Sequence, residues 1–172
     1  MISAPPQVEV VETLSREEAT ARMKGVEVEF RGAAVPMFGR DYSGPPPEDL
    51  KYAVVAEDSV RGLAWWCQRV TRGLKAQGYQ SRSNNRDCDD RADLIQALRQ
   101  FIDTGDSSLF LVKLTFSYPR GALGVEGRPG STHQLLGVLA DTGWYAIEVS
   151  DGQYCRLADF PNRDGALYYQ LH

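Results

Sequence analysis

The 172-residue sequence is poor in the residues that usually mark a metal centre or a disulfide scaffold, since it has three cysteines and two histidines. Three cysteines cannot all pair within one chain, which favours free thiols and a reducing compartment. No two cysteines have the C-x-x-C spacing typical of a zinc site. We therefore expect neither a bound metal nor a disulfide framework.

Several other features are missing from the sequence. It has no apolar run of about 18 residues, so no membrane-spanning helix is predicted. The segment MISAPPQVEV lacks the regions of a signal peptide. A net charge of −4 without a Lys/Arg cluster argues against nucleic-acid binding. Neither G-x-G-x-x-G nor G-x-x-x-x-G-K-[ST] occurs, so we expect no nucleotide and no other cofactor.

The composition is that of one soluble globular domain, with 42% hydrophobic and 24% charged residues. Residues 1–58 match no family that we can place, and we treat them as an N-terminal extension of unassigned role. Within them we predict a strand at Gln7–Leu14, a helix that opens with a capping box of Ser15 and Glu18, and a short buried strand at 52–56. Residues 59–172 form the predicted core of the single domain.

Two amphipathic helices are predicted in this core. The first spans Glu57–Gly78 and has an apolar stripe at helical spacing, formed by Leu63, Trp66, Cys67, Val70 and Leu74. The adjacent Trp65 and Trp66 are interpreted as core anchors, with a substrate platform as the alternative. The second helix begins at Cys88, where Asp87 is a suitable N-cap, and runs to Asp103.

Strands dominate the rest of the sequence. Residues 108–118 alternate between apolar and polar, and THQLLGVLA, WYAIEVS and QYCRL follow as three strands of an antiparallel meander. Because the helices precede the sheet along the chain, the predicted fold class is α+β. The glycine-rich loop 119–131 leads into His133, and we expect it to border the site as a flap.

One cysteine, one histidine and two acids are candidates for a catalytic site. Cys88 lies in the first turn of its helix, and His133 begins the first strand of the meander. If the turn after Ala140 has two or four residues, Glu148 lies on the face of His133. If the turn has three residues, Asp151 lies opposite His133 instead.

Nucleophilic catalysis requires these three groups. A thiolate attacks, an imidazole moves the proton, and a carboxylate orients the ring. The dipole of a helix favours a thiolate at its N-terminus, although Asp89 and Asp90 oppose this effect here. The thiolate of Cys88 would therefore depend on the charge of His133.

The segments RDCDDRADLIQAL, STHQLLGVL and GWYAIEVSDGQ resemble the transglutaminase-like cysteine peptidase superfamily, most of all its small bacterial and phage-encoded members. The resemblance covers about 84–153. It implies a papain-like core with N-terminal helices packed on an antiparallel sheet. It also implies a catalytic triad of Cys88, His133 and Glu148. Gln134 departs from the pattern, because many members have a small residue after the histidine.

The resemblance implies a cysteine-dependent hydrolase or acyl transferase that acts on amide bonds in peptides, peptidoglycan or proteins. The alternative is a non-catalytic structural or interaction protein, such as a phage particle component within a larger assembly. We expect no nucleic-acid or membrane partner. The predicted location is the cytoplasm of a bacterial or phage-infected cell, with the virion as the alternative.

Overall fold

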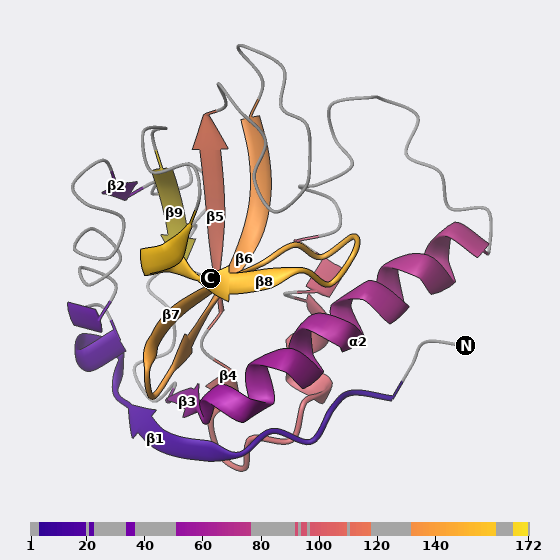
Figure 1. The fold of residues 1–172 in the computed structure, drawn as a ribbon. Helices are drawn as coiled ribbons and strands as arrows, with labels where there is room; N and C mark the ends of the chain where they lie inside the picture. Colours follow the sequence, from indigo (N-terminus) through magenta and orange to yellow (C-terminus); the bar gives the residue numbers. More distant parts are fainter. Residues whose placement is uncertain are drawn as a thin grey trace.

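A computed structural model describes residues 4–19, 21–22, 34–36, 51–76, 92, 94–95, 97–109, 111–117, 132–160 and 167–171. Within these ranges a mixed nine-stranded sheet is crossed by a long helix, α2 (Figure 1). The elements are β1 Val10–Leu14, β2 Ala34–Pro36, β3 Tyr52–Val55, α2 Glu57–Ala76, η1 Arg99–Phe101, β4 Ser108–Leu109, β5 Leu111–Ser117, β6 Thr132–Ala140, β7 Gly143–Ile147, β8 Tyr154–Arg156, η2 Leu157–Asp159 and β9 Leu167–Leu171.

The sheet has the order β1-β3-β6-β5-β9-β2, with β4 beside β3, and β7 between β6 and β8. Most neighbours are antiparallel, but β3 runs parallel to β4 and β6, and β2 runs parallel to β9. The predicted N-terminal helices on an antiparallel sheet are therefore wrong. The first part of the chain supplies β1 and β3, which confirms the strands predicted at 7–14 and 52–56. Tyr52–Val55 is a fully buried apolar run of the kind that central strands require. The division at residue 58 stays a prediction.

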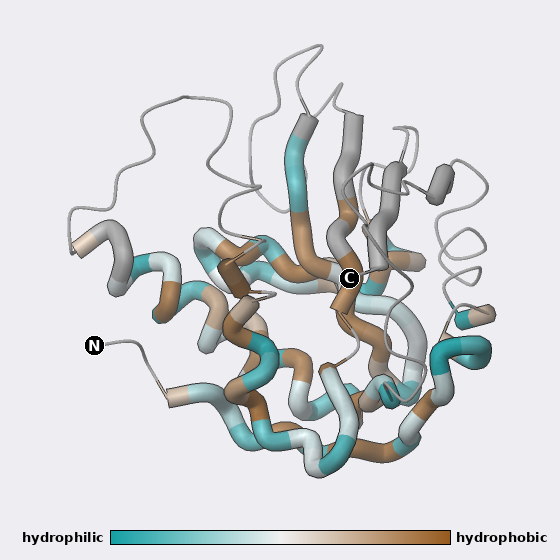
Figure 2. The backbone as a smooth tube through the Cα atoms, turned by 180° about the vertical axis from the view of Figure 1, so that it is seen from behind, coloured by the Kyte–Doolittle hydropathy of each residue, from teal (hydrophilic) through white to brown (hydrophobic). Residues whose placement is uncertain are grey.

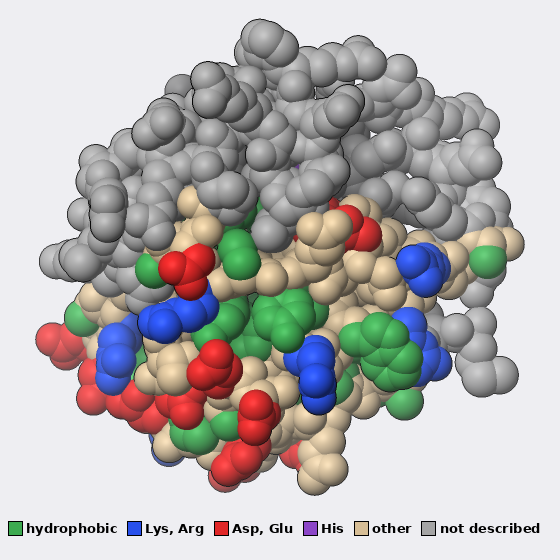
Figure 3. Space-filling model, in the orientation of Figure 1, with side chains coloured by type: hydrophobic (Ala, Val, Ile, Leu, Met, Phe, Trp, Pro, Cys, Tyr) green, Lys and Arg blue, Asp and Glu red, His purple; other side chains and the backbone are tan. Residues whose placement is uncertain are grey.

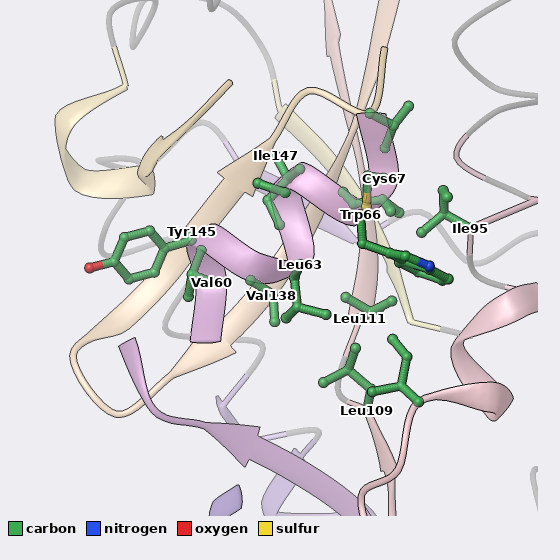
Figure 4. Packing of buried hydrophobic residues seen from close by; sticks show 14 of the residues in the cluster. Val60, Leu63, Trp66, Cys67, Ile95, Leu109, Leu111, Val138, Tyr145 and Ile147 are labelled. Atoms are coloured by element: carbon green, nitrogen blue, oxygen red, sulfur yellow. The ribbon is translucent and has the colours of Figure 1, made fainter. Parts of the chain in front are cut away.

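Helix α2 packs its apolar stripe against one face of the sheet, as its spacing predicts. Leu63, Trp66 and Cys67 are buried, and they lie toward Leu111 and Val138 on the strands (Figure 4). Hydrophobic residues gather in the central strands, and along α2 they alternate with hydrophilic ones (Figure 2). The prediction of this helix and of Cys67 as a core residue is confirmed.

The two adjacent tryptophans of α2 point to different environments. Trp66 is 3% exposed and belongs to the core, whereas Trp65 is 59% exposed. The interpretation of both as core anchors is correct for Trp66 and wrong for Trp65. An indole that remains this exposed is free to contact a ligand or a partner.

The β6–β7 hairpin has a two-residue loop, because Ala140 pairs with Gly143. Leu136 pairs with Ile147, and one further step in this register brings Leu135 opposite Glu148. Since side chains alternate along a strand, His133 and Glu148 share one face. The two-residue alternative is confirmed, and β8 completes the predicted meander.

Tertiary contacts hold this hairpin turn. Asp141 donates its backbone N–H to the carbonyl of Val55 (3.0 Å), and its Oδ1 accepts the backbone N–H of Glu57 (3.0 Å). The hydroxyl of Tyr145 donates to the carboxylate of Glu57. The turn is thus tied both to β3 and to the first residue of α2.

Candidate functional site

A histidine–glutamate pair lies where β6 begins and β7 ends. The Nε2 atom of His133 is hydrogen bonded to Oε2 of Glu148. The side chain of Glu148 is 1% exposed and that of His133 is 13% exposed. Buried carboxylates require partners, and this one has an imidazole.

Glu148 also accepts two hydrogen bonds from Ser150. The backbone N–H of Ser150 lies 3.0 Å from Oε1 of Glu148, and its hydroxyl lies 2.6 Å from the same atom. Burial raises the pKa of Glu148, but the hydrogen bond and charge of His133 and the donors of Ser150 outweigh it. The pKa therefore lies below its ordinary value, and the carboxylate is ionised at neutral pH. An ionised acceptor fixes the proton of the bond on Nε2 of His133.

The loop that carries Glu148 is anchored on α2. Thr71 donates its hydroxyl to the carbonyl of Val149 (2.9 Å), and Gln68 donates its amide to the carbonyl of Asp151. Gly152 has a φ of 76°, and a β-carbon there would lie 2.9 Å from the carbonyl oxygen of Ala64. The loop can lie this close to the helix because position 152 has no side chain.

The acid that faces the histidine is Glu148, as we predicted, and not Asp151. The carboxylate of Asp151 accepts the backbone N–H of Gln153 (2.9 Å) within its own turn. Cys88 and the loop 119–131, predicted as nucleophile and flap, lie outside the described residues. The catalytic roles of Cys88, His133 and Glu148 therefore stay predictions.

The other two cysteines are unsuited to nucleophilic chemistry. Burial raises the pKa of the Cys67 thiol to about 12. Burial, followed by the nearby charge of Asp159, raises the pKa of Cys155 to about 11. Both are protonated at neutral pH, and a protonated thiol reacts slowly.

A second feature is a surface groove of about 330 Å³ between α2 and the loop that follows Glu148. Its lining combines two exposed aromatic side chains, 59% exposed for Trp65 and 39% for Tyr154, with polar groups and glycines: Arg61, Gly62, Gln68 and Gly152. The guanidinium of Arg69 lies 4.6 Å from the centre of the Trp65 ring. Over α2, exposed hydrophobic side chains lie between Lys and Arg side chains (Figure 3).

The sequence-based interpretation missed this groove. The signal for Trp65 was its position off the apolar stripe of α2, beside Arg61 and Arg69 at four-residue spacing. No comparable signal marks Tyr154, which comes from a strand far along the chain. The groove is formed only by packing of β8 and its preceding loop against the helix.

Other kinds of site find no support in the described part of the chain. There, no group of three His, Cys, Asp or Glu side chains could hold a metal ion. Nor does any helix described combine the length and apolar character needed to cross a membrane.

Comparison with known proteins finds a similar fold but no matching family model or curated protein. The fold is similar to a solved lectin of Polyporus squamosus bound to the epitope Neu5Acα2-6Galβ1-4GlcNAc, with a TM-score of 0.54 and 15% identity. The match covers 92% of this chain and 49% of the lectin chain, so the chain spans about half the length of that protein.

This finding contradicts the resemblance to transglutaminase-like cysteine peptidases. The papain-like fold class is wrong with it, because the described residues form mostly strands with one long helix in a fold similar to that of the lectin chain. The prediction of a cysteine-dependent hydrolase or acyl transferase on amide bonds is contradicted together with that resemblance. A peptide or protein amide substrate and a phage origin have no support either. Motifs of a few residues on common helices and strands arise in unrelated chains, and three such motifs misled the assignment.

Proposed function

We propose that the chain binds carbohydrate in the groove between α2 and β8. The observation that carries this proposal is the exposure of Trp65 and Tyr154 within one groove that also has the polar side chains of Arg61 and Gln68. The similarity of the fold to a lectin supports it. Binding sites for small ligands usually combine such apolar walls with a few placed polar groups.

The lining suits the surface of a sugar ring. One face of a pyranose carries mostly C–H groups, and it can stack on the flat face of an indole or a phenol. Hydroxyl groups project from the edge of the ring and require hydrogen-bonding partners. The Arg61 guanidinium provides donors, and the Gln68 amide provides both donor and acceptor atoms.

The aromatic wall is held in place before a ligand arrives. Arg69 lies over one face of Trp65, an arrangement that stabilises the ring by a cation–π interaction. Gln68 is fixed through its bond to the carbonyl of Asp151. Groups that are already ordered lose less conformational entropy on binding, which favours a measurable affinity.

A glycan array followed by titration calorimetry tests the proposal. We expect binding of at least one glycan, and Trp65→Ala should weaken it about tenfold or more, which corresponds to roughly 1.4 kcal/mol. Phe101→Ala is the matched control, because Phe101 is a 62% exposed aromatic outside the groove. Absence of binding across the array, or equal losses in both variants, would refute the proposal.

We propose a second role for the His133–Glu148 pair, namely proton transfer. The hydrogen bond from Nε2 of His133 to a buried, ionised Glu148 supports it, because such a carboxylate selects one tautomer and makes the other ring nitrogen the basic one. Long-range ¹H–¹⁵N spectra of the imidazole should show the Nδ1 atom as the acceptor nitrogen. In Glu148→Gln the preference of His133 for this tautomer should be lost. An imidazole spectrum unchanged from that of the wild type would exclude the role.

A further inference from the structure

We propose that the groove selects sugars that carry a carboxylate, such as a sialic or uronic acid, over neutral sugars. This inference rests on the proposed carbohydrate binding and adds a ligand class to it. It depends on the charge of Arg61, which the stacking argument does not use.

The charge of the groove is positive although the whole chain carries −4. Among the described lining residues, Arg61 carries a positive charge and none carries a carboxylate. Arg69 adds a second guanidinium directly over the indole of Trp65. An anion in the groove would thus meet the charge of Arg61 and no fixed negative charge in the described lining, with the charge of Arg69 behind the indole.

The spacing along α2 places one cation beside a stacked sugar. Arg61 precedes Trp65 by four residues, so the two side chains lie on one face of the helix about 6 Å apart along its axis. Arg69 covers one face of the indole, which leaves the opposite face for a pyranose. A carboxylate attached to a pyranose stacked there can be reached by Arg61, which lines the same groove.

Arg61 is available for such a contact. It is exposed, and its side chain forms no ion pair or hydrogen bond within the described part of the chain. A guanidinium can donate two parallel hydrogen bonds to one carboxylate, a geometry that an ammonium group cannot reproduce. A neutral sugar offers no charge to Arg61, and this difference is the source of the selectivity.

The test compares carboxylated glycans with their own methyl esters, which keep the shape and lose the charge. The probes are Neu5Acα2-6Galβ1-4GlcNAc and oligosaccharides that end in glucuronate or galacturonate, each titrated calorimetrically as acid and ester. We expect at least one acid to bind about tenfold more tightly than its ester, because a charge-assisted hydrogen bond is stronger than a neutral one. The preference should shrink as salt increases.

Arg61→Gln should remove the preference for the acid over its own ester, and Arg61→Lys should restore only part of that preference. Arg72→Gln is the control, since it removes the same charge from an exposed position of α2 outside the groove lining. Equal affinity for acids and esters, or equal effects of the two glutamine variants, overturns the inference and leaves carbohydrate binding intact. If neither acids, esters nor neutral glycans bind, both proposals fail.

Discussion

The Nε2 atom of His133 is hydrogen bonded to Oε2 of Glu148, a side chain that comes fifteen residues later and is 1% exposed. The bond joins the start of β6 to the end of β7. Because Glu148 accepts this bond as an ionised carboxylate, the contribution of the pair to the free energy of unfolding depends on pH. This dependence can be measured without knowledge of a ligand.

Glu148→Gln should lower the free energy of unfolding at pH 7 by about 1–3 kcal/mol, because His133 and Ser150 lose an ionised acceptor. The folded-state pKa of Glu148 lies below its ordinary value of 4.5. Its stabilising effect is therefore fully present above pH 4.5 and is lost as the pH falls through the lower, folded-state value. The difference between wild type and variant should shrink over that acidic range in urea titrations. Asp151→Asn should keep the wild-type profile; a constant difference at every pH would contradict this assignment.

Gly152→Ala should destabilise the fold by about 1–3 kcal/mol, because the residue has a left-handed backbone and a β-carbon would contact α2. The same variant should weaken glycan binding, since Gly152 lines the groove. Gly105→Ala separates the two causes: its φ is 66° and nothing lies within 4 Å of the added carbon. Equal destabilisation of both variants in thermal unfolding would show that contact with Ala64 is unimportant.

Gly137→Ala should destabilise the sheet by about 1–3 kcal/mol through overpacking. The new β-carbon would lie 2.5 Å from Cγ2 of Val112 and 3.0 Å from Cδ1 of Leu114. Gly73→Ala in α2 has open space and should instead stabilise by about 0.5–1 kcal/mol, as alanine favours helix. Chemical denaturation of both variants checks the contrast, and a Gly137→Ala, Val112→Ala double-mutant cycle should show favourable coupling. Additive effects would mean that the two side chains do not meet.

Cys88 should react with iodoacetamide faster than Cys67 or Cys155. Burial raises the pKa of those two thiols to about 12 and about 11, which suppresses their reactive thiolates. If Cys88 lies beside His133, as the sequence predicts, His133→Ala should slow its labelling. Peptide mapping by mass spectrometry gives each rate. A Cys88 rate no faster than that of Cys67 would remove the predicted role of Cys88, while the His133–Glu148 pair would remain.

The sequence by itself determined the local elements and restricted one side-chain pair to two alternatives. The stripe of Leu63, Trp66 and Cys67 specifies α2, because helical spacing brings these residues to one face. The alternating strands specify the β6–β7–β8 meander. Such periodicities depend on neighbours two to four residues apart, so a single sequence contains them. They also restricted the partner of His133 to two acids.

Only the tertiary structure decided whether Glu148 or Asp151 faces His133, and only the tertiary structure forms the groove from distant segments. Asp141 bonds both β3 and α2, and these contacts hold the two-residue turn that places Glu148 beside His133. Trp65 and Tyr154 lie far apart along the chain and line one groove because the loop before β8 packs on α2. Likewise β1, β2 and β3 join the sheet by pairing with distant strands, which no local pattern specifies. Pairing and packing between distant segments depend on the whole chain, and for this reason short motifs indicated the wrong family while local periodicity indicated the correct elements.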